Sequence, residues 1–211
     1  ELLTLIQQPW AWYDRDQLTH LNFPKANDAI IGRLYMPHFI KISEQLTDLP
    51  QQEILFYWRV AMQDICVIET KLMDLNVEQY QKLIINIEIW QKLNPALQSK
   101  INNLHLKQSQ LMQFHKGDLA VGKRVFAACH DAVSLQYAQH IGCDAVLLSP
   151  VQVTETHPDA KELGWDGFAE LAKRSDIPVF ALGGVAPEDL EKAQKHFAYG
   201  LPGIRQFQVL N

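Results

Sequence analysis

Short apolar runs rich in β-branched residues alternate with amphipathic stretches along most of this chain, at fairly regular intervals from His38 onward. This alternation is typical of βα units and indicates a parallel sheet. We predict eight strands: His38–Ile42, Glu53–Arg59, Lys82–Asn86, Asn103–Leu106, Arg124–Cys129, Asp144–Ser149, Ile177–Leu182 and, with the weakest pattern, Gly203–Gln206.

Two helices are predicted between these strands. Ala132–Ile141 separates the fifth strand from the sixth, and Pro187–Phe197 separates the seventh from the eighth. Eight such units close most naturally as a compact TIM (β/α)8 barrel, which is the fold class we predict. An open, doubly wound sheet is the alternative, because the barrel region of roughly 170 residues is short against the usual ~250.

Residues 1–36 differ from the rest of the chain in their sequence pattern. Aromatic residues stand there among turn formers, and a helix is expected over Asn27–Leu34. The chain begins at Glu1, without methionine, and continues into apolar residues at helical spacing. We therefore interpret 1–36 as the tail of a preceding domain with its linker, and 37–211 as the barrel.

Composition narrows the class of protein. Of the 211 residues 47% are hydrophobic, the formal net charge is -5, and no run of lysine or arginine suggests a nucleic-acid surface. Three widely spaced cysteines, Cys66, Cys129 and Cys143, predict neither a disulfide framework nor a zinc site. No apolar run is long enough to span a membrane, and no signal peptide is recognisable. We expect a cytoplasmic protein with no membrane or nucleic-acid partner.

A glycine pair, Gly183-Gly184, follows the seventh predicted strand. Loops after barrel strands carry the reactive groups, and paired glycines let backbone N–H groups approach an anion closely. We expect a phosphate there, and we expect Gly184→Val to abolish its binding with little loss of fold. A simple tight turn is the alternative.

The loop after the sixth strand gathers polar groups. Two threonine hydroxyls, Thr154 and Thr156, the carboxylate Glu155 and the imidazole of His157 lie within nine residues that start at Ser149. This set could clamp a ligand. A solvated loop in which the hydroxyls cap turns is the alternative.

These residues carry a family resemblance. The strings Gly142, Asp144, Ser149-Pro150-Val151, Thr154, Thr156 and Ile177-Pro178-Val179, Ala181, Gly183-Gly184 resemble the sixth and seventh strands of thiamine phosphate synthases and TenI-type proteins. Arg59, Leu83–Asn86, Leu104–Leu106 and Ala127–His130 are similar to that family's Q-L-R-x-K, L-I-I-N-D, V-H-L and S-x-H motifs.

The resemblance implies a site at the carboxyl ends of the strands. It implies substrate contacts from Arg59, Asn86, Ser149, Thr154 and Thr156, and phosphate contacts from Gly183 and Gly184. Arg205 could add a phosphate contact, because a guanidinium binds phosphate bidentately. The candidates for proton transfer are His105, His130 and His157, since imidazole suits that task, although each could equally be a structural histidine.

The family's synthases join a pyrimidine diphosphate to a thiazole phosphate with magnesium. Several positions that would hold the diphosphate and metal differ in this chain: Tyr57, Ala61, Ile87, Gln110 and His157. The histidine of TenI-type tautomerases is Pro150. Glu88 should point away from the site if it continues the third strand. We therefore expect no metal and no cofactor.

The chain looks most like a subgroup of these barrels fused behind a Nudix hydrolase domain of the MutT type. The shared residues include Thr156-His157-Pro158 and Leu163-Gly164-Trp165, and Trp12-Tyr13 with Phe23–Asn27 resemble the end of a Nudix domain. One hypothesis is a barrel that acts on or binds a phosphorylated thiazole or pyrimidine precursor in thiamine biosynthesis or salvage. The alternative is a non-catalytic ligand-binding or regulatory module fused to a Nudix pyrophosphatase. The expected partners are the small phosphorylated ligand and the upstream Nudix domain, and a homodimer is kept open.

Overall fold

The computed structural model describes residues 10–27, 31, 36–52, 54–62, 64–153, 161–204 and 207. The chain divides into two compact units, Glu1–Met36 and Pro37–Asn211. In the first unit the described residues form two 3-10 helices, Arg15–His20 and Lys25–Asn27. The helix predicted over Asn27–Leu34 falls almost wholly outside the described residues.

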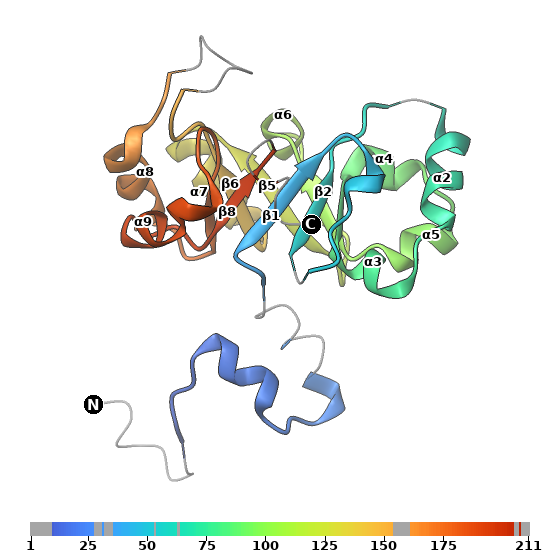
Figure 1. Ribbon diagram of the computed structural model, residues 1–211, viewed down its shortest axis with the longest axis horizontal. Coiled ribbons are helices and arrows are strands. Elements are labelled where there is room, and N and C mark those ends of the chain that lie inside the picture. The colour runs from blue at the N-terminus through green and yellow to red at the C-terminus, as the bar shows by residue number, and fades with distance from the viewer. Residues whose placement is uncertain are drawn as a thin grey trace. The chain divides into compact units, whose positions relative to one another are not determined.

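The second unit is a barrel of eight parallel strands (Figure 1). Their order is β7-β6-β5-β4-β3-β2-β1-β8, so each strand pairs with its sequence neighbour and β1 also pairs with β8. The strands are β1 Phe39–Ser43, β2 Leu55–Trp58, β3 Leu83–Asn86, β4 Asn103–Leu106, β5 Arg124–Cys129, β6 Ala145–Leu148, β7 Val179–Ala181 and β8 Leu201–Gly203.

The ring closes between β7 and β8. A parallel bridge joins Phe180 to Gly200, the Ala181 N–H donates to the Gly200 carbonyl at 3.0 Å, and the Tyr199 N–H donates to the Val179 carbonyl at 2.7 Å. The closed barrel is thereby confirmed, and the open doubly wound sheet is excluded.

The last strand lies earlier than predicted. It runs over Leu201–Gly203 and not Gly203–Gln206. Proline lacks an N–H and is therefore uncommon in the middle of a sheet. The structure accommodates Pro202 because alternate residues of a strand donate to opposite neighbours. Leu201 donates to His38 on the β1 side, and pairing with β7 has already ended at Gly200.

The barrel's helices lie around the strands (Figure 1), with α7, α8 and α9 on one side and α2 to α5 on the other. Their bounds are α2 Ile65–Met73, α3 Val77–Lys82, α4 Ile87–Lys92, α5 Pro95–Lys100, α6 Gln108–Leu111, α7 Ala132–Ile141, α8 Gly164–Ala172 and α9 Leu190–Lys195, with 3-10 turns at Leu46–Asp48 and Pro187–Asp189. The prediction for α7 is confirmed, and Asp131 caps this helix by accepting from the Ser134 N–H at 2.7 Å. The stretch predicted as one helix over Pro187–Phe197 is instead a 3-10 turn followed by α9.

Helix α4 begins directly after β3, which differs from our treatment of Glu88 as a strand residue. The Asn86 side chain accepts a hydrogen bond from the Glu88 N–H at 3.0 Å and so caps the helix. Because Ile87 and Glu88 lie in a helical turn, strand alternation does not govern where Glu88 points. Glu88 is exposed, and Ile87 is buried.

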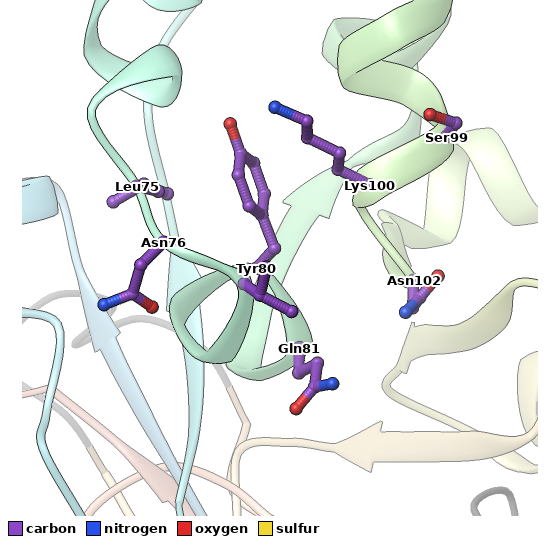
Figure 2. A pocket seen from close by; sticks show the side chains of 8 residues that line it. Leu75, Asn76, Tyr80, Gln81, Ser99, Lys100 and Asn102 are labelled. Atoms are coloured by element: carbon purple, nitrogen blue, oxygen red, sulfur yellow. The ribbon is translucent and has the colours of Figure 1, made fainter.

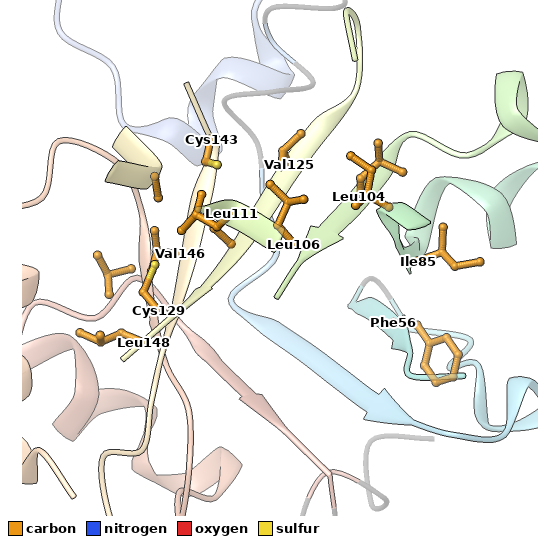
Figure 3. Packing of buried hydrophobic residues seen from close by; sticks show 14 of the residues in the cluster. Phe56, Ile85, Leu104, Leu106, Leu111, Val125, Cys129, Cys143, Val146 and Leu148 are labelled. Carbon is orange, nitrogen blue, oxygen red and sulfur yellow. The ribbon is translucent and has the colours of Figure 1, made fainter. Parts of the chain in front are cut away.

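One face of each strand packs against the helices. Figure 3 shows this layer, in which Phe56, Ile85, Leu104, Val125 and Val146 come from successive strands. Successive side chains of a strand point to opposite faces. The residues between them, such as Tyr57, Ile84, His105 and Phe126, therefore point into the barrel. Among the described residues no helix is long and apolar enough to cross a membrane.

Candidate functional site

The described candidate residues lie at one end of the barrel. Arg59 follows β2, Asn86 ends β3, His105 is the third residue of β4, His130 follows β5, Ser149 follows β6 and Gly183-Gly184 follow β7. In a parallel barrel these carboxyl ends share one rim, where the sites of such barrels form. Thr154, Thr156, His157 and Arg205 lie outside the described residues.

His105 is enclosed inside the barrel. Its ring stacks on Tyr57 with centroids 4.4 Å apart, and both side chains are buried. Burial, helped by the positive charge of Lys107, lowers the pKa of His105 to about 3, while burial raises the pKa of Tyr57 to about 12. Both groups are therefore neutral near pH 7. A neutral, enclosed imidazole suits a packing role better than it suits proton transfer.

Asn86 and Gln110 form a reciprocal amide pair. Asn86 Nδ2 donates to Gln110 Oε1 at 2.9 Å, and Gln110 Nε2 donates to Asn86 Oδ1 at 3.1 Å. Asn86 Oδ1 also accepts from the Glu88 N–H at 3.0 Å, and Gln110 Oε1 also accepts from the Lys107 N–H at 2.8 Å. An amide oxygen has two lone pairs, so both oxygens are fully used.

Magnesium does not fit this arrangement. It requires oxygen ligands. Of the two positions that differ from the family's acidic ligands, Ile87 has no side-chain oxygen, and the oxygen of the buried Gln110 already accepts two hydrogen bonds. In the part of the chain that the structure describes, no group of three or more His, Cys, Asp or Glu side chains could hold a metal ion.

We expect calorimetry with MgCl2, in the absence of any phosphorylated ligand, to show no saturable binding. Gln110→Glu is the comparison variant, because it keeps an acceptor for Asn86 and Lys107 while adding the negative charge that a hard cation prefers. It should bind magnesium more tightly than the parent. Saturable binding to the parent with a Kd below roughly 1 mM would contradict the assignment.

Arg59 is held by a residue that sequence reasoning did not single out. Its guanidinium donates to Glu44 Oε1 at 3.0 Å, and both side chains are exposed. The Trp58 indole N–H fixes the Glu44 backbone by donating to its carbonyl at 3.0 Å. An exposed ion pair is worth about 0–1 kcal/mol, so Arg59 can exchange Glu44 for an anionic ligand at little cost.

His130 lies at the rim and is exposed. Its Nδ1 is 2.7 Å from the Ser149 carbonyl oxygen and 3.2 Å from the Ser149 hydroxyl. The ends of β5 and β6 are thus joined by an imidazole. Of the two histidine candidates that the structure describes, His130 is the accessible one.

The glycine pair is required by both conformation and contact. Gly183 and Gly184 have φ of 102° and 68°, and a Cβ on Gly184 would lie 2.7 Å from the Gln152 Cβ. The loop after β6 is bonded to this turn, with the Val151 N–H donating to the Leu182 carbonyl at 2.9 Å and the Gln152 N–H to the Gly183 carbonyl at 3.1 Å. Within the described part of the chain, neither glycine N–H donates a hydrogen bond. The expectation that Gly184→Val would leave the fold intact is wrong, because it adds strain and a clash.

A groove of the described surface lies elsewhere. It has a volume of about 460 Å³ and runs between α3 and α5, where Figure 2 shows the Lys100 side chain beside the Tyr80 ring. The Lys100 ammonium is 5.2 Å from the centroid of that ring. These residues precede β3 and β4, so the groove lies at the amino ends of the strands and contains no candidate residue.

A closed ring of eight parallel strands with helices around it and polar groups at the carboxyl rim defines a (β/α)8 barrel. The sequence profile of the family described as thiamine monophosphate synthase matches residues 66–207. The chain belongs to this family.

Its relatives carry corresponding names. The chain is 31% identical over 137 residues to a putative thiamine-phosphate synthase 2 of Aquifex aeolicus, covering 62% of this chain and 68% of that one. It is 27% identical over 126 residues to a thiamine-phosphate synthase of Prochlorococcus marinus strain AS9601, covering 56% of this chain and 33% of that one. The chain thus spans about two thirds of the first relative and one third of the second.

Solved structures agree on the fold. A thiamine phosphate pyrophosphorylase from Pyrococcus furiosus superposes with a TM-score of 0.58 at 14% identity, covering 79% of this chain and 84% of that one. A thiamine phosphate pyrophosphorylase from Bacteroides thetaiotaomicron gives 0.57 at 15% identity, covering 82% and 84%. At such identities the likeness concerns the barrel and not the chemistry.

Proposed function

We propose that this barrel acts on or binds a phosphorylated thiazole or pyrimidine precursor in thiamine biosynthesis or salvage. The observation that carries the proposal is the Gly183-Gly184 turn. Its two N–H groups donate to no other described residue, and its backbone conformation is one that side chains rarely adopt. Such a turn binds phosphate by close backbone approach. The names of the family's members support the choice of ligand.

The same rim favours a ligand with one phosphate over a diphosphate. The Asn86–Gln110 pair is neutral and internally satisfied, and the charge of Arg59 is balanced by Glu44. A diphosphate brings more negative charge than these groups can neutralise without a metal. A single phosphate on the glycine turn needs only backbone donors, with Arg59 available at the rim.

The test is a thermal-shift comparison of hydroxyethyl-methylthiazole phosphate with the unphosphorylated thiazole. The phosphate ester at 100 times its Kd should stabilise the protein by about 2.7 kcal/mol, a shift in Tm of roughly 5–10 °C. The free alcohol and inorganic phosphate alone should each give a much smaller shift in Tm. The alcohol cannot bind the glycine turn through a phosphate, and inorganic phosphate has no ring to contact the rest of the rim. Equal shifts from the ester and the alcohol would contradict the phosphate assignment.

The proposed Nudix fusion rests on the resemblance alone, and the proposed location rests on the widely spaced cysteines. We propose that residues 1–36 end a Nudix domain of a longer parent chain, that the protein is cytoplasmic, and that a homodimer is its assembly if it has one. A non-catalytic module fused to a Nudix pyrophosphatase is the alternative function, and no feature of the described rim favours it over the first.

A further inference from the structure

Glu44 is an acidic residue bound to Arg59 at the carboxyl rim. We propose that Glu44 is a specificity-determining residue, which occupies Arg59 in the place of a ligand's anionic group and so excludes diphosphates from the rim. The glycine turn stays open to a single phosphate. This inference rests on the proposed function and deepens it, because it names the residue that limits the charge a ligand can carry.

Both side chains stand at neighbouring strand ends. Glu44 directly follows β1, and Arg59 directly follows β2, which pairs with β1. The Arg59 Nη2 donates to Glu44 Oε1 at 3.0 Å, with 41% of the Arg59 side chain and 72% of the Glu44 side chain exposed. An anion that arrives from solvent therefore meets a guanidinium that already has a carboxylate bound to it.

The backbone of Glu44 is held without the help of its carboxylate. The indole N–H of the buried Trp58 donates to the Glu44 carbonyl oxygen at 3.0 Å, and the Arg59 N–H donates to the Ser43 carbonyl oxygen at 2.7 Å. A carboxylate fixed in this way competes as an intramolecular ligand, at an effective concentration that a free anion must exceed. Because the anchors do not use the Glu44 side chain, removal of its charge should free Arg59 and leave the loop in place.

The charges at this side of the rim cancel. Within the first two residues after each of β1 to β4, the described structure has two cations, Arg59 and Lys107, and two carboxylates, Glu44 and Glu88. Lys107 lies close enough to His105 for its positive charge to lower the pKa of that imidazole. A phosphate monoester carries a charge of about −1.5 to −2 near pH 7, and a diphosphate carries more. A diphosphate therefore gains net attraction here only if one of the two carboxylates is removed.

The glycine turn binds an anion on different terms. Gly183-Gly184 follow β7, and β8 stands between β7 and β1 in the ring. The donors of the turn are backbone N–H groups, so a single phosphate can bind there while Arg59 stays paired. A second phosphate needs a cation, and Arg59 is the one suited to bidentate contact. Glu44 thus discriminates between ligands by a repulsive element that opposes only the more highly charged one.

The experiment compares inorganic pyrophosphate with hydroxyethyl-methylthiazole phosphate by titration calorimetry near neutral pH, with EDTA present so that no metal contributes. Glu44→Gln should tighten pyrophosphate binding about 10-fold, because it frees Arg59 and removes a repulsive charge, each worth a few-fold at an exposed site. Binding of the thiazole phosphate should change by about 2-fold or less, since its phosphate is held by backbone N–H groups. The readout is the ratio of the two affinities.

Glu88→Gln is the matched control. It makes the same chemical change to an exposed carboxylate of the same rim, and Glu88 forms no ion pair with another described residue. It should tighten pyrophosphate binding by about 2-fold or less. In an Arg59→Gln background, Glu44→Gln should bring no gain, which a general effect of net charge would not reproduce.

The two proposals fail separately. If Glu44→Gln and Glu88→Gln change pyrophosphate binding alike, or if the gain from Glu44→Gln persists without Arg59, the role of Glu44 is overturned. Equal tightening of both ligands by Glu44→Gln would overturn the discrimination by charge. If the parent protein does not bind the thiazole phosphate, the proposed function itself has failed, while the pyrophosphate titrations still report on Glu44.

Discussion

Gly200→Ala should lower the free energy of unfolding by about 3 kcal/mol or more, a large part of the 5–15 kcal/mol that holds a typical domain together. A Cβ on Gly200 would lie 2.0 Å from the His38 carbonyl oxygen and 2.7 Å from its carbon. That oxygen accepts the hydrogen bond from the Leu201 N–H at 2.7 Å, so it cannot retreat without breaking β1–β8 pairing. The substitution therefore disrupts the pairing of β1 with β8, which the closed barrel requires.

Thermal unfolding followed by circular dichroism measures the effect, which should lower Tm by roughly 6 °C or more at 2–4 °C per kcal/mol. Gly167→Ala in α8 is the control, because its Cβ would meet only the Leu163 Cβ at an ordinary 3.8 Å. Alanine in a helix interior is favoured over glycine by about 0.5–1 kcal/mol, so this control should raise Tm. A Gly200→Ala protein that melts with the parent would contradict the described closure.

Asn86→Leu should cost about 3 kcal/mol of stability, the second largest effect we expect. The change removes the cap of α4 and leaves the buried Gln110 amide without its partner. A lost cap costs about 1 kcal/mol and an unsatisfied buried polar group about 1–3 kcal/mol. Gln110→Met alone should cost about 2 kcal/mol of stability, because it leaves the buried Asn86 amide without its hydrogen-bond partner.

The double variant distinguishes a coupled pair from two independent residues. With both amides replaced by apolar groups of similar shape, no polar group of the pair is left unsatisfied. The combined cost, measured by urea unfolding, should therefore fall short of the sum of the single costs by about 1 kcal/mol. Additive costs would show that the reciprocal hydrogen bonds do not couple the two side chains.

Much of the fold could be predicted from the sequence, because buried parallel strands and their helices repeat a simple pattern. Asn103–Leu106, Arg124–Cys129 and Ala132–Ile141 match their predicted bounds, and the other strands differ by a few residues at their ends. The eighth strand was misplaced because a proline in a strand is tolerated only where its missing N–H has no partner to meet. That condition depends on where β7 stops pairing, which no local pattern shows.

The site was harder to predict than the fold. The positions of the candidate residues follow from the rule that carboxyl ends of parallel strands share a rim. The partners of these residues do not follow from that rule. Glu44, Tyr57 and Gln110 come from different strand–helix segments and reach Arg59, His105 and Asn86 only in the folded barrel. A glutamine at a position that elsewhere is acidic signalled a lost metal ligand, yet its pairing with Asn86 is a property of three-dimensional packing.

The enclosed imidazole of His105 makes the stability of the barrel depend on pH. The folded protein takes up a proton there only near pH 3, whereas the unfolded chain takes one up near pH 6.5. Above pH 6.5 both states are neutral at this residue, and it adds no pH dependence. As the pH falls from 6.5 toward 3, protons bind to the unfolded chain first, so acid draws the equilibrium toward unfolding. The stack that keeps Tyr57 and His105 uncharged therefore also makes His105 a point at which mild acid weakens the barrel.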